Sequence, residues 1–296
     1  MSSSNIPKKQ HYVPQTYLQK FSDEENYLHI YDIKTNQFRK QRPQSTGYGK
    51  HFYTIEHDGI KDPFIEHFLA NEVDSKYVNV INKIENSKLF SDEDRLNLST
   101  FIAFQHLRTP AQRENYNSMV TKFHKTRVQF EFLYRKNTGT LKDMDNMSKA
   151  ELAELERIVD EGEYGVSVPK GHSLKFMFDF ADKMISFINN QNWVIVKAPT
   201  KSRFITSDNP YCMLKVKDVA EWEGYGLINT NKFFPLTSDF LLVITGKGSK
   251  VINFKFNSSQ VRTQNLLTIM QANRNLYSPN EKLLKRLVED MRKSKG

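Results

Sequence analysis

From Pro63 to about Asn137, apolar residues recur every three or four positions, which is the period of an amphipathic α-helix. Ser91 and the three acids after it form a capping-box-like helix start inside this stretch. Pro110 is expected to break or kink the helix that begins there. Further helices are predicted over 17–21, 149–160, 174–188, 261–272 and 281–292. The middle of the chain is therefore predicted to be helical.

Runs of β-branched and aromatic residues predict strands on either side of this helical part. A small antiparallel unit is predicted over 27–56, with a third strand at 51–55. The last third contains strands at 193–196, 204–206, 233–235 and 240–244. We predict an α+β fold, in which the helical middle segment packs with a mostly antiparallel sheet from the last third, plus the small N-terminal β unit. Residues 1–10 are expected to form a flexible tail and residues 11–296 a single domain.

The chain of 296 residues has 43 basic and 34 acidic side chains, a formal net charge of +9. Such an excess favours polyanionic partners, and we expect nucleic acid first. The single cysteine, Cys212, excludes an internal disulfide and a cysteine-based zinc cluster, and its apolar neighbours predict a buried, inert thiol. No 18-residue apolar run and no signal-peptide core is present, so a cytoplasmic protein without a membrane partner is expected. The sequence does not give the oligomeric state.

His11 and Gln15 belong to the segment His11-Tyr12-Val13-Pro14-Gln15, in which the proline is well placed to start a short helix. A histidine held beside a fixed turn is a candidate general acid or base, because its pKa lies near neutral pH. The alternative is a structural hydrogen bond. Gln15 is a candidate substrate-binding residue.

Gln105 and Arg108 are three residues apart and share a helical face with large apolar side chains. An arginine enclosed on such a face needs an anion. That anion is either a substrate phosphate or a carboxylate of the preceding helix, with Glu66 and Glu72 as the candidates.

The run Thr206-Ser207-Asp208-Asn209-Pro210 follows a predicted strand and places polar side chains at a turn, where ligand sites are often built. The alternative is an Asx-turn that satisfies local backbone groups. Glu72 and Asp208 together are a candidate Mg²⁺ site, since carboxylate oxygens suit that ion. The histidines show no metal-ligand spacing.

Basic and aromatic residues alternate along the helix that contains Lys122 and Lys125. This pattern suits the backbone and bases of a nucleic acid, and the two lysines are candidate substrate-binding residues. It equally suits an ordinary helix with one solvated and one buried face.

Taken together, three motifs resemble one bacterial family of unknown function. They are the signature His11-Tyr12-Val13-Pro14-x-x-Tyr17-Leu18-x-x-Phe21, the string Phe104-Gln105-x-x-Arg108-Thr109-Pro110, and Phe204-x-Thr206-Ser207-Asp208-Asn209-Pro210 with Phe234-Pro235-Leu236. The resemblance spans nearly the whole chain and implies a single cytoplasmic bacterial domain. The family has no established activity, but the match marks His11, Gln105, Arg108, Asp208 and Asn209 as a set.

The leading hypothesis is a phosphodiester-cleaving enzyme acting on RNA or DNA, in bacterial defence or as a toxin. In it His11 is the general acid or base, Arg108 stabilises the charge on the phosphate, and Asp208 orients His11 or binds Mg²⁺. Gln105 and Asn209 position the substrate. The alternative is a non-catalytic module that binds nucleic acid or a small anion. A third option is hydrolysis of a nucleotide or another small phosphate ester.

Overall fold

The computed structural model describes residues 7–57, 60–140, 147–216 and 229–293. Backbone packing divides the chain into two compact units, of which unit 1 comprises Met1–Ala111 and Met177–Gly296, and unit 2 comprises Gln112–Phe176. The predicted mixture is confirmed: helices dominate the middle of the chain, and the sheets are mostly antiparallel.

The largest sheet of unit 1 has five strands in the order β12-β7-β11-β10-β9. Its strands are β7 (Gln191–Lys197), β9 (Cys212–Lys215), β10 (Thr230–Pro235), β11 (Phe240–Lys247) and β12 (Val251–Lys255). All pairs are antiparallel except β12 with β7. The predicted strands at 193–196, 233–235 and 240–244 form its centre, because their residues are apolar enough to be buried between layers.

A second sheet joins the two ends of the chain, in the order β3-β2-β13-β8. Its strands are β2 (Leu28–Asp32), β3 (Gln37–Gln41), β8 (Thr206–Ser207) and β13 (Asn275–Ser278). The predicted β unit near the N-terminus thus extends through β13 into the C-terminal part of the chain.

Two short two-stranded sheets complete the β structure of the described residues. They pair β1 (Lys9–His11) with β4 (Tyr48–Lys50) and β5 (Ile55–His57) with β6 (Ile60–Asp62). The third strand predicted at 51–55 is wrong for residues 51–54, where His51 has a φ of 48° and the chain turns between β4 and β5. β1 begins at Lys9, inside the predicted tail.

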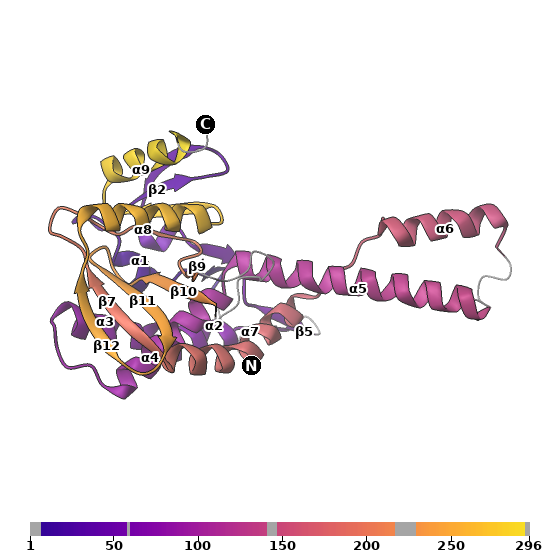
Figure 1. The fold of residues 1–296 in the computed structure, drawn as a ribbon, viewed down its shortest axis with the longest axis horizontal. Coiled ribbons are helices and arrows are strands. Elements are labelled where there is room, and N and C mark those ends of the chain that lie inside the picture. Colours follow the sequence, from indigo (N-terminus) through magenta and orange to yellow (C-terminus); the bar gives the residue numbers. More distant parts are fainter. Residues whose placement is uncertain (1–6, 58–59, 141–146, 217–228, 294–296) are drawn as a thin grey trace. The chain divides into compact units, whose positions relative to one another are not determined.

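The helical part of unit 1 follows the predicted periodicity. After α1 (Gln15–Gln19) and the 3₁₀ turn η1 (Pro43–Ser45), the chain forms α2 (Phe64–Phe68), the π-helical segment η2 (Leu69–Asp74), α3 (Ser75–Glu85) and α4 (Asp92–Leu107). Ser91 caps α4 in a capping box with Asp94, and Pro110 separates α4 from the next helix, as predicted. The last helices, α8 (Ser258–Gln271) and α9 (Glu281–Lys293), lie side by side (Figure 1).

Unit 2 is a helical hairpin. The C-terminal half of α5 (Pro110–Thr138) packs beside α6 (Lys149–Glu161), which runs in the opposite direction (Figure 1). Lys125 donates to the Gly162 carbonyl, and Lys136 forms an ion pair with Glu156. The helix α7 (Lys170–Asn189) follows, and both α5 and α7 continue from one unit into the other.

Candidate functional site

Arg108 is fully buried at the end of α4, and its guanidinium is held by protein groups. Its Nη1 and Nη2 donate to the two carboxylate oxygens of Asp74 at 3.2 and 2.8 Å, and its Nε donates to Gln105 Oε1 at 3.0 Å. Burial alone would lower the pKa of Arg108, but the adjacent Asp74 raises it, so the side chain stays charged. The enclosed arginine therefore has the anion it needs, and this anion is Asp74 rather than Glu66 or Glu72.

His11 lies near this ion pair, at the end of β1. Its Nδ1 is 3.4 Å from Nε2 of Gln15, and its ring packs against Tyr48. Burial lowers the pKa of His11, as do the charges of Lys9 and Arg108, while the backbone of Gln44 acts in the opposite direction. His11 is therefore neutral at physiological pH, with its ring half-buried.

Glu66 of α2 is an acidic group beside His11, and its carboxylate accepts a hydrogen bond from the backbone of His11. Burial raises the pKa of Glu66 to about 7; Arg108 opposes this shift and Asp74 adds to it. The neighbourhood of His11 thus contains a neutral imidazole and a carboxyl that changes protonation near neutral pH.

The pKa of Glu66 has a measurable consequence for stability. The folded chain keeps the Glu66 proton up to about pH 7, whereas a free glutamate loses it near 4.5, so unfolding is expected to become easier as pH rises from 4.5 to 7. Glu66→Gln mimics the protonated form, and we expect it to be more stable than wild type at pH 8 by about 1–2 kcal/mol, allowing for partial exposure, and similar at pH 4.5. Thermal unfolding at several pH values tests this, with the exposed Glu72→Gln as control; parallel curves for wild type and Glu66→Gln would contradict it.

Asp208 is buried, and backbone N–H groups of a distant segment surround its carboxylate. Oδ1 accepts from Asn273 and Arg274, and Oδ2 accepts from Arg274 and Asn275, all at 3.0 to 3.1 Å. The side chain therefore fixes the start of β13 against β8. No bond to His11 is formed, and the carboxylate is directed at the protein backbone.

The remaining candidate residues have separate surroundings. Gln105 Nε2 donates to the Tyr12 carbonyl, and Asn209 Nδ2 donates to the Gln271 carbonyl. Glu72 is exposed and pairs with Lys76 at 3.2 Å, so the structure does not bring it together with Asp208. Among the described residues, no group of three or more His, Cys, Asp or Glu side chains is arranged to hold a metal ion.

The two candidate lysines belong to unit 2. Lys122 is exposed on α5, whereas Lys125 donates to the Gly162 carbonyl at 2.6 Å and lies over the ring of Tyr164. Cys212, in contrast, is fully buried in β9, and burial raises the pKa of its thiol to about 12, in agreement with the predicted inert cysteine.

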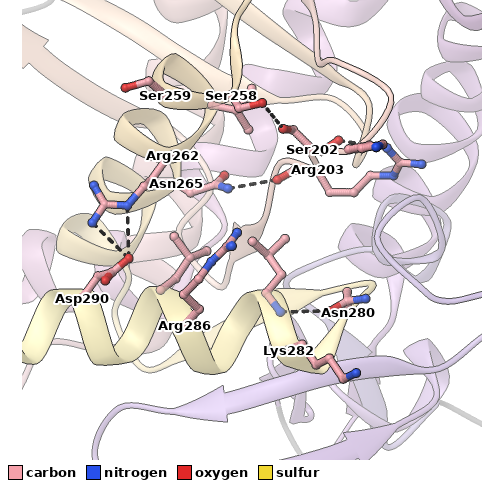
Figure 2. Close-up of a pocket in the computed structure, with 14 residues that line it drawn as sticks. Ser202, Arg203, Ser258, Ser259, Arg262, Asn265, Asn280, Lys282, Arg286 and Asp290 are labelled. Atoms are coloured by element: carbon pink, nitrogen blue, oxygen red, sulfur yellow. Dashed lines mark hydrogen bonds and ion pairs between the residues drawn. The ribbon is translucent and has the colours of Figure 1, made fainter.

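A pocket of about 880 Å³ lies in unit 1 between α8, α9 and the loop that leads from β7 to β8. Figure 2 shows Arg262 and two serines on the α8 side and Arg286 on the α9 side. The charged lining consists of five basic side chains and one acidic one: Lys201, Arg203, Arg262, Lys282, Arg286 and Asp290. Val261, Leu283 and Leu287 supply an apolar part of the wall.

Three of these five cations have no carboxylate partner in the described parts of the chain. Arg262 pairs with Asp290 at 3.0 Å and Arg203 with Asp239 at 3.3 Å, but Lys201, Lys282 and Arg286 form no such pair. The side-chain amide of Asn265, by contrast, is hydrogen-bonded to the backbone: it accepts from the Ile205 N–H and donates to the Arg203 carbonyl. The pocket is therefore a concentration of uncompensated positive charge.

Comparison with protein families matches the chain to a family described as Protein of unknown function (DUF4238), over residues 9–282. The chain belongs to this family. The search of curated proteins found no match, and the search of solved structures found none. Within the described residues, no helix is both long and apolar enough to cross a bilayer.

The motifs that suggested the family meet inside unit 1, around the N-terminal segment. The hydroxyl oxygen of Tyr17, a residue of the signature, lies 2.6 Å from Oγ1 of Thr206. The same hydroxyl donates to the Pro235 carbonyl at 2.8 Å. Its ring also packs against Phe101 and Phe234. In this family member the motif residues join the three parts of the chain in the core.

Sequence reasoning did not find the basic pocket. Its residues come from the loop after β7 and from the two C-terminal helices α8 and α9, and each segment by itself resembles an ordinary solvated surface. Arg286 in particular belongs to a basic C-terminal helix of the kind that is usually just exposed. Two features of the sequence could have indicated the pocket: the pair of serines at the start of α8 and the net charge of +9.

Proposed function

We propose that this protein is a binding module for a small phosphate-bearing ligand, and that the pocket between α8 and α9 is its site. The observation that carries the proposal is the lining, in which three unpaired cations and two ion-paired arginines surround about 880 Å³. Guanidinium and ammonium groups are the side chains that bind phosphate most strongly in proteins. A volume of this size is typical of small-molecule sites.

The rest of the lining supports the same ligand class. Ser258 and Ser259 begin α8 directly after its N-cap residue Asn257, so hydroxyls and the first backbone N–H groups of the helix lie beside the cations. The apolar side chains of Val261 and Leu287 offer a surface for a ring or a base. A nucleotide combines phosphate groups with an aromatic base, so it matches both parts of this lining. We therefore propose a ligand of about nucleotide size.

Cleavage of a phosphodiester is the second candidate, and His11 with Glu66 is the observation that favours it. A neutral imidazole and a carboxyl that titrates near neutral pH belong to neighbouring residues, joined by a hydrogen bond from the His11 backbone to Glu66, and such groups suit a general base and acid. In this version Arg108 and Asp208 support the fold around His11, because their polar atoms are bonded to protein.

The test is a binding titration with ATP, pyrophosphate and short single-stranded RNA and DNA, with and without Mg²⁺. We expect saturable, salt-sensitive binding of ATP or pyrophosphate that weakens about 100-fold in Lys201→Glu/Arg286→Glu. Lys293→Glu, an exposed change on the same helix outside the pocket, is the matched control.

The same samples are run on gels after incubation with RNA and DNA. Binding without cleavage supports the module. Cleavage that is lost in His11→Ala supports the enzyme instead, and unchanged affinity in the double variant contradicts the pocket as the site.

A further inference from the structure

A second pocket of unit 1, with a volume of about 680 Å³, lies on one face of the five-stranded sheet. Its floor comes from β7, β11 and β12, and one wall comes from the end of α3 and the segment that leads to α4. The lining is mostly apolar, with three phenylalanines, and it carries three lysines, Lys88, Lys197 and Lys255. None of the described residues in this lining is acidic. The pocket therefore combines positive charge with apolar surface in a volume typical of small-molecule sites.

Two of these lysines, Lys197 and Lys255, are direct neighbours on adjacent strands. They are partners in the parallel register of β7 with β12, so their side chains leave the same face of the sheet from backbones about 4.8 Å apart. Like charges placed opposite each other on neighbouring strands repel and cost stability. Lys197 lies over the ring of Phe240 at 5.6 Å, and in the described parts of the chain neither lysine forms an ion pair with a carboxylate.

Protection of the sheet edge does not explain this pair. Lysines on an edge strand discourage pairing with other chains, and that role suits Lys255, because β12 is the outermost strand of the sheet (Figure 1). Lys197, however, belongs to β7, which is hydrogen-bonded to β12 on one side and to β11 on the other. The charge at this position fits an anion held between the two ammonium groups.

The floor of the pocket beside the two lysines is apolar. Phe240 is the partner of Lys197 on β11, and Ile195 faces the same side of the sheet two residues earlier on β7. Phe254 and Val251 of β12 also line the pocket and are 51% and 39% exposed. Half-exposed apolar side chains around a hollow gain free energy when an apolar ligand covers them.

We propose that this pocket binds an amphipathic carboxylate, a ligand with one small anionic group and an apolar chain. The carboxylate is held between the ammonium groups of Lys197 and Lys255, and the chain lies on the apolar floor. All charged side chains of the described lining are lysines, so the pocket lacks the arginine forks that suit phosphate in the pocket between α8 and α9. The two pockets share no described residue, and this site does not depend on the proposed function.

Calorimetric titration of the full chain with decanoate tests the proposal, with decanol and acetate as probes that carry only the chain or only the carboxylate. We expect saturable binding of decanoate, at least about tenfold weaker binding of decanol and no measurable binding of acetate. Lys197→Glu and Lys255→Glu are each expected to weaken decanoate binding at least about tenfold, because each puts a negative charge beside the ligand's carboxylate. Phe254→Ala, at a half-exposed position, removes part of the apolar lining and is expected to weaken binding several-fold.

Lys250→Glu is the matched control for the charge change. Lys250 directly precedes β12, at the end of the strand opposite Lys255, and it is exposed outside the lining. We expect this variant to bind decanoate within about twofold of wild type, because salt screens charges at that distance. A loss in Lys250→Glu equal to the loss in Lys255→Glu would show attraction by net charge alone and would overturn the proposal.

A second measurement locates the ligand. The one native cysteine, Cys212, is buried, so Asn253→Cys provides an accessible thiol in the floor of the pocket. Decanoate is expected to slow alkylation of this thiol by iodoacetamide several-fold, and to leave the thiol of Met270→Cys, at a position 77% exposed on α8, unprotected. The proposal is overturned if decanoate does not bind saturably, if decanol binds equally well, if both lysine variants bind like wild type, or if Asn253→Cys is not protected.

Discussion

Arg108→Met is expected to lower the free energy of unfolding by about 3–5 kcal/mol, more than any other single substitution predicted for this chain. The guanidinium is fully buried and forms both bonds of a bidentate pair with Asp74. Methionine fills much of the same volume but leaves the Asp74 carboxyl without its partner in the interior, where burial opposes its charge. Equilibrium denaturant unfolding measures the change.

A second variant separates the ion pair from simple loss of packing. In Asp74→Leu/Arg108→Met both charges are removed, and we expect it to recover a large part of the lost stability, because no isolated charge remains buried. Lys76→Met, which breaks the exposed pair with Glu72, is expected to change stability by less than about 1 kcal/mol. If the Arg108→Met variant had the same free energy of unfolding as wild type, the guanidinium would not stabilise the fold.

Asp208→Ala is expected to cost about 2–4 kcal/mol, the second largest effect, because it leaves the N–H groups of Asn273, Arg274 and Asn275 without their acceptor. These bonds fix β13 between β2 and β8, so the start of that strand should also exchange its amide hydrogens faster. Hydrogen exchange and denaturant unfolding measure the two effects.

Asp62→Ala is the control for this prediction. Asp62 also accepts a backbone bond, from Phe64, but at an exposed position, so its loss is expected to cost less than about 1 kcal/mol. If Asp208→Ala were as stable as wild type while ligand binding disappeared, Asp208 would belong to a binding site after all.

The long helices and strands could be predicted from the sequence, because each buries one face and its apolar residues therefore recur with a regular period. The helices of the middle segment and the strands at 193–196 and 240–244 follow directly from apolar spacing. The apolar pattern did not predict the short strands β1, β4, β9 and β13, since each has only three or four residues and owes its conformation to pairing with distant segments.

The partner of Arg108 shows why the candidate site was harder to predict. The need for an anion followed from an arginine on an apolar helical face, but the choice of acid did not. The π-helical segment Leu69–Asp74 carries one extra residue per turn, which rotates Asp74 toward α4 and leaves Glu72 in solvent. A pattern based on 3.6 residues per turn cannot anticipate this rotation.

We expect the family motifs to build the core of this protein, and the ligand to bind elsewhere, between α8 and α9. Calorimetric titration of pyrophosphate into His11→Ala and Arg286→Glu, compared with wild type, separates the two roles. We predict that His11→Ala binds as wild type does, and that Arg286→Glu stays folded and loses at least about tenfold in affinity. Loss of binding in His11→Ala with full binding by Arg286→Glu would contradict this division and return the ligand site to the motif residues.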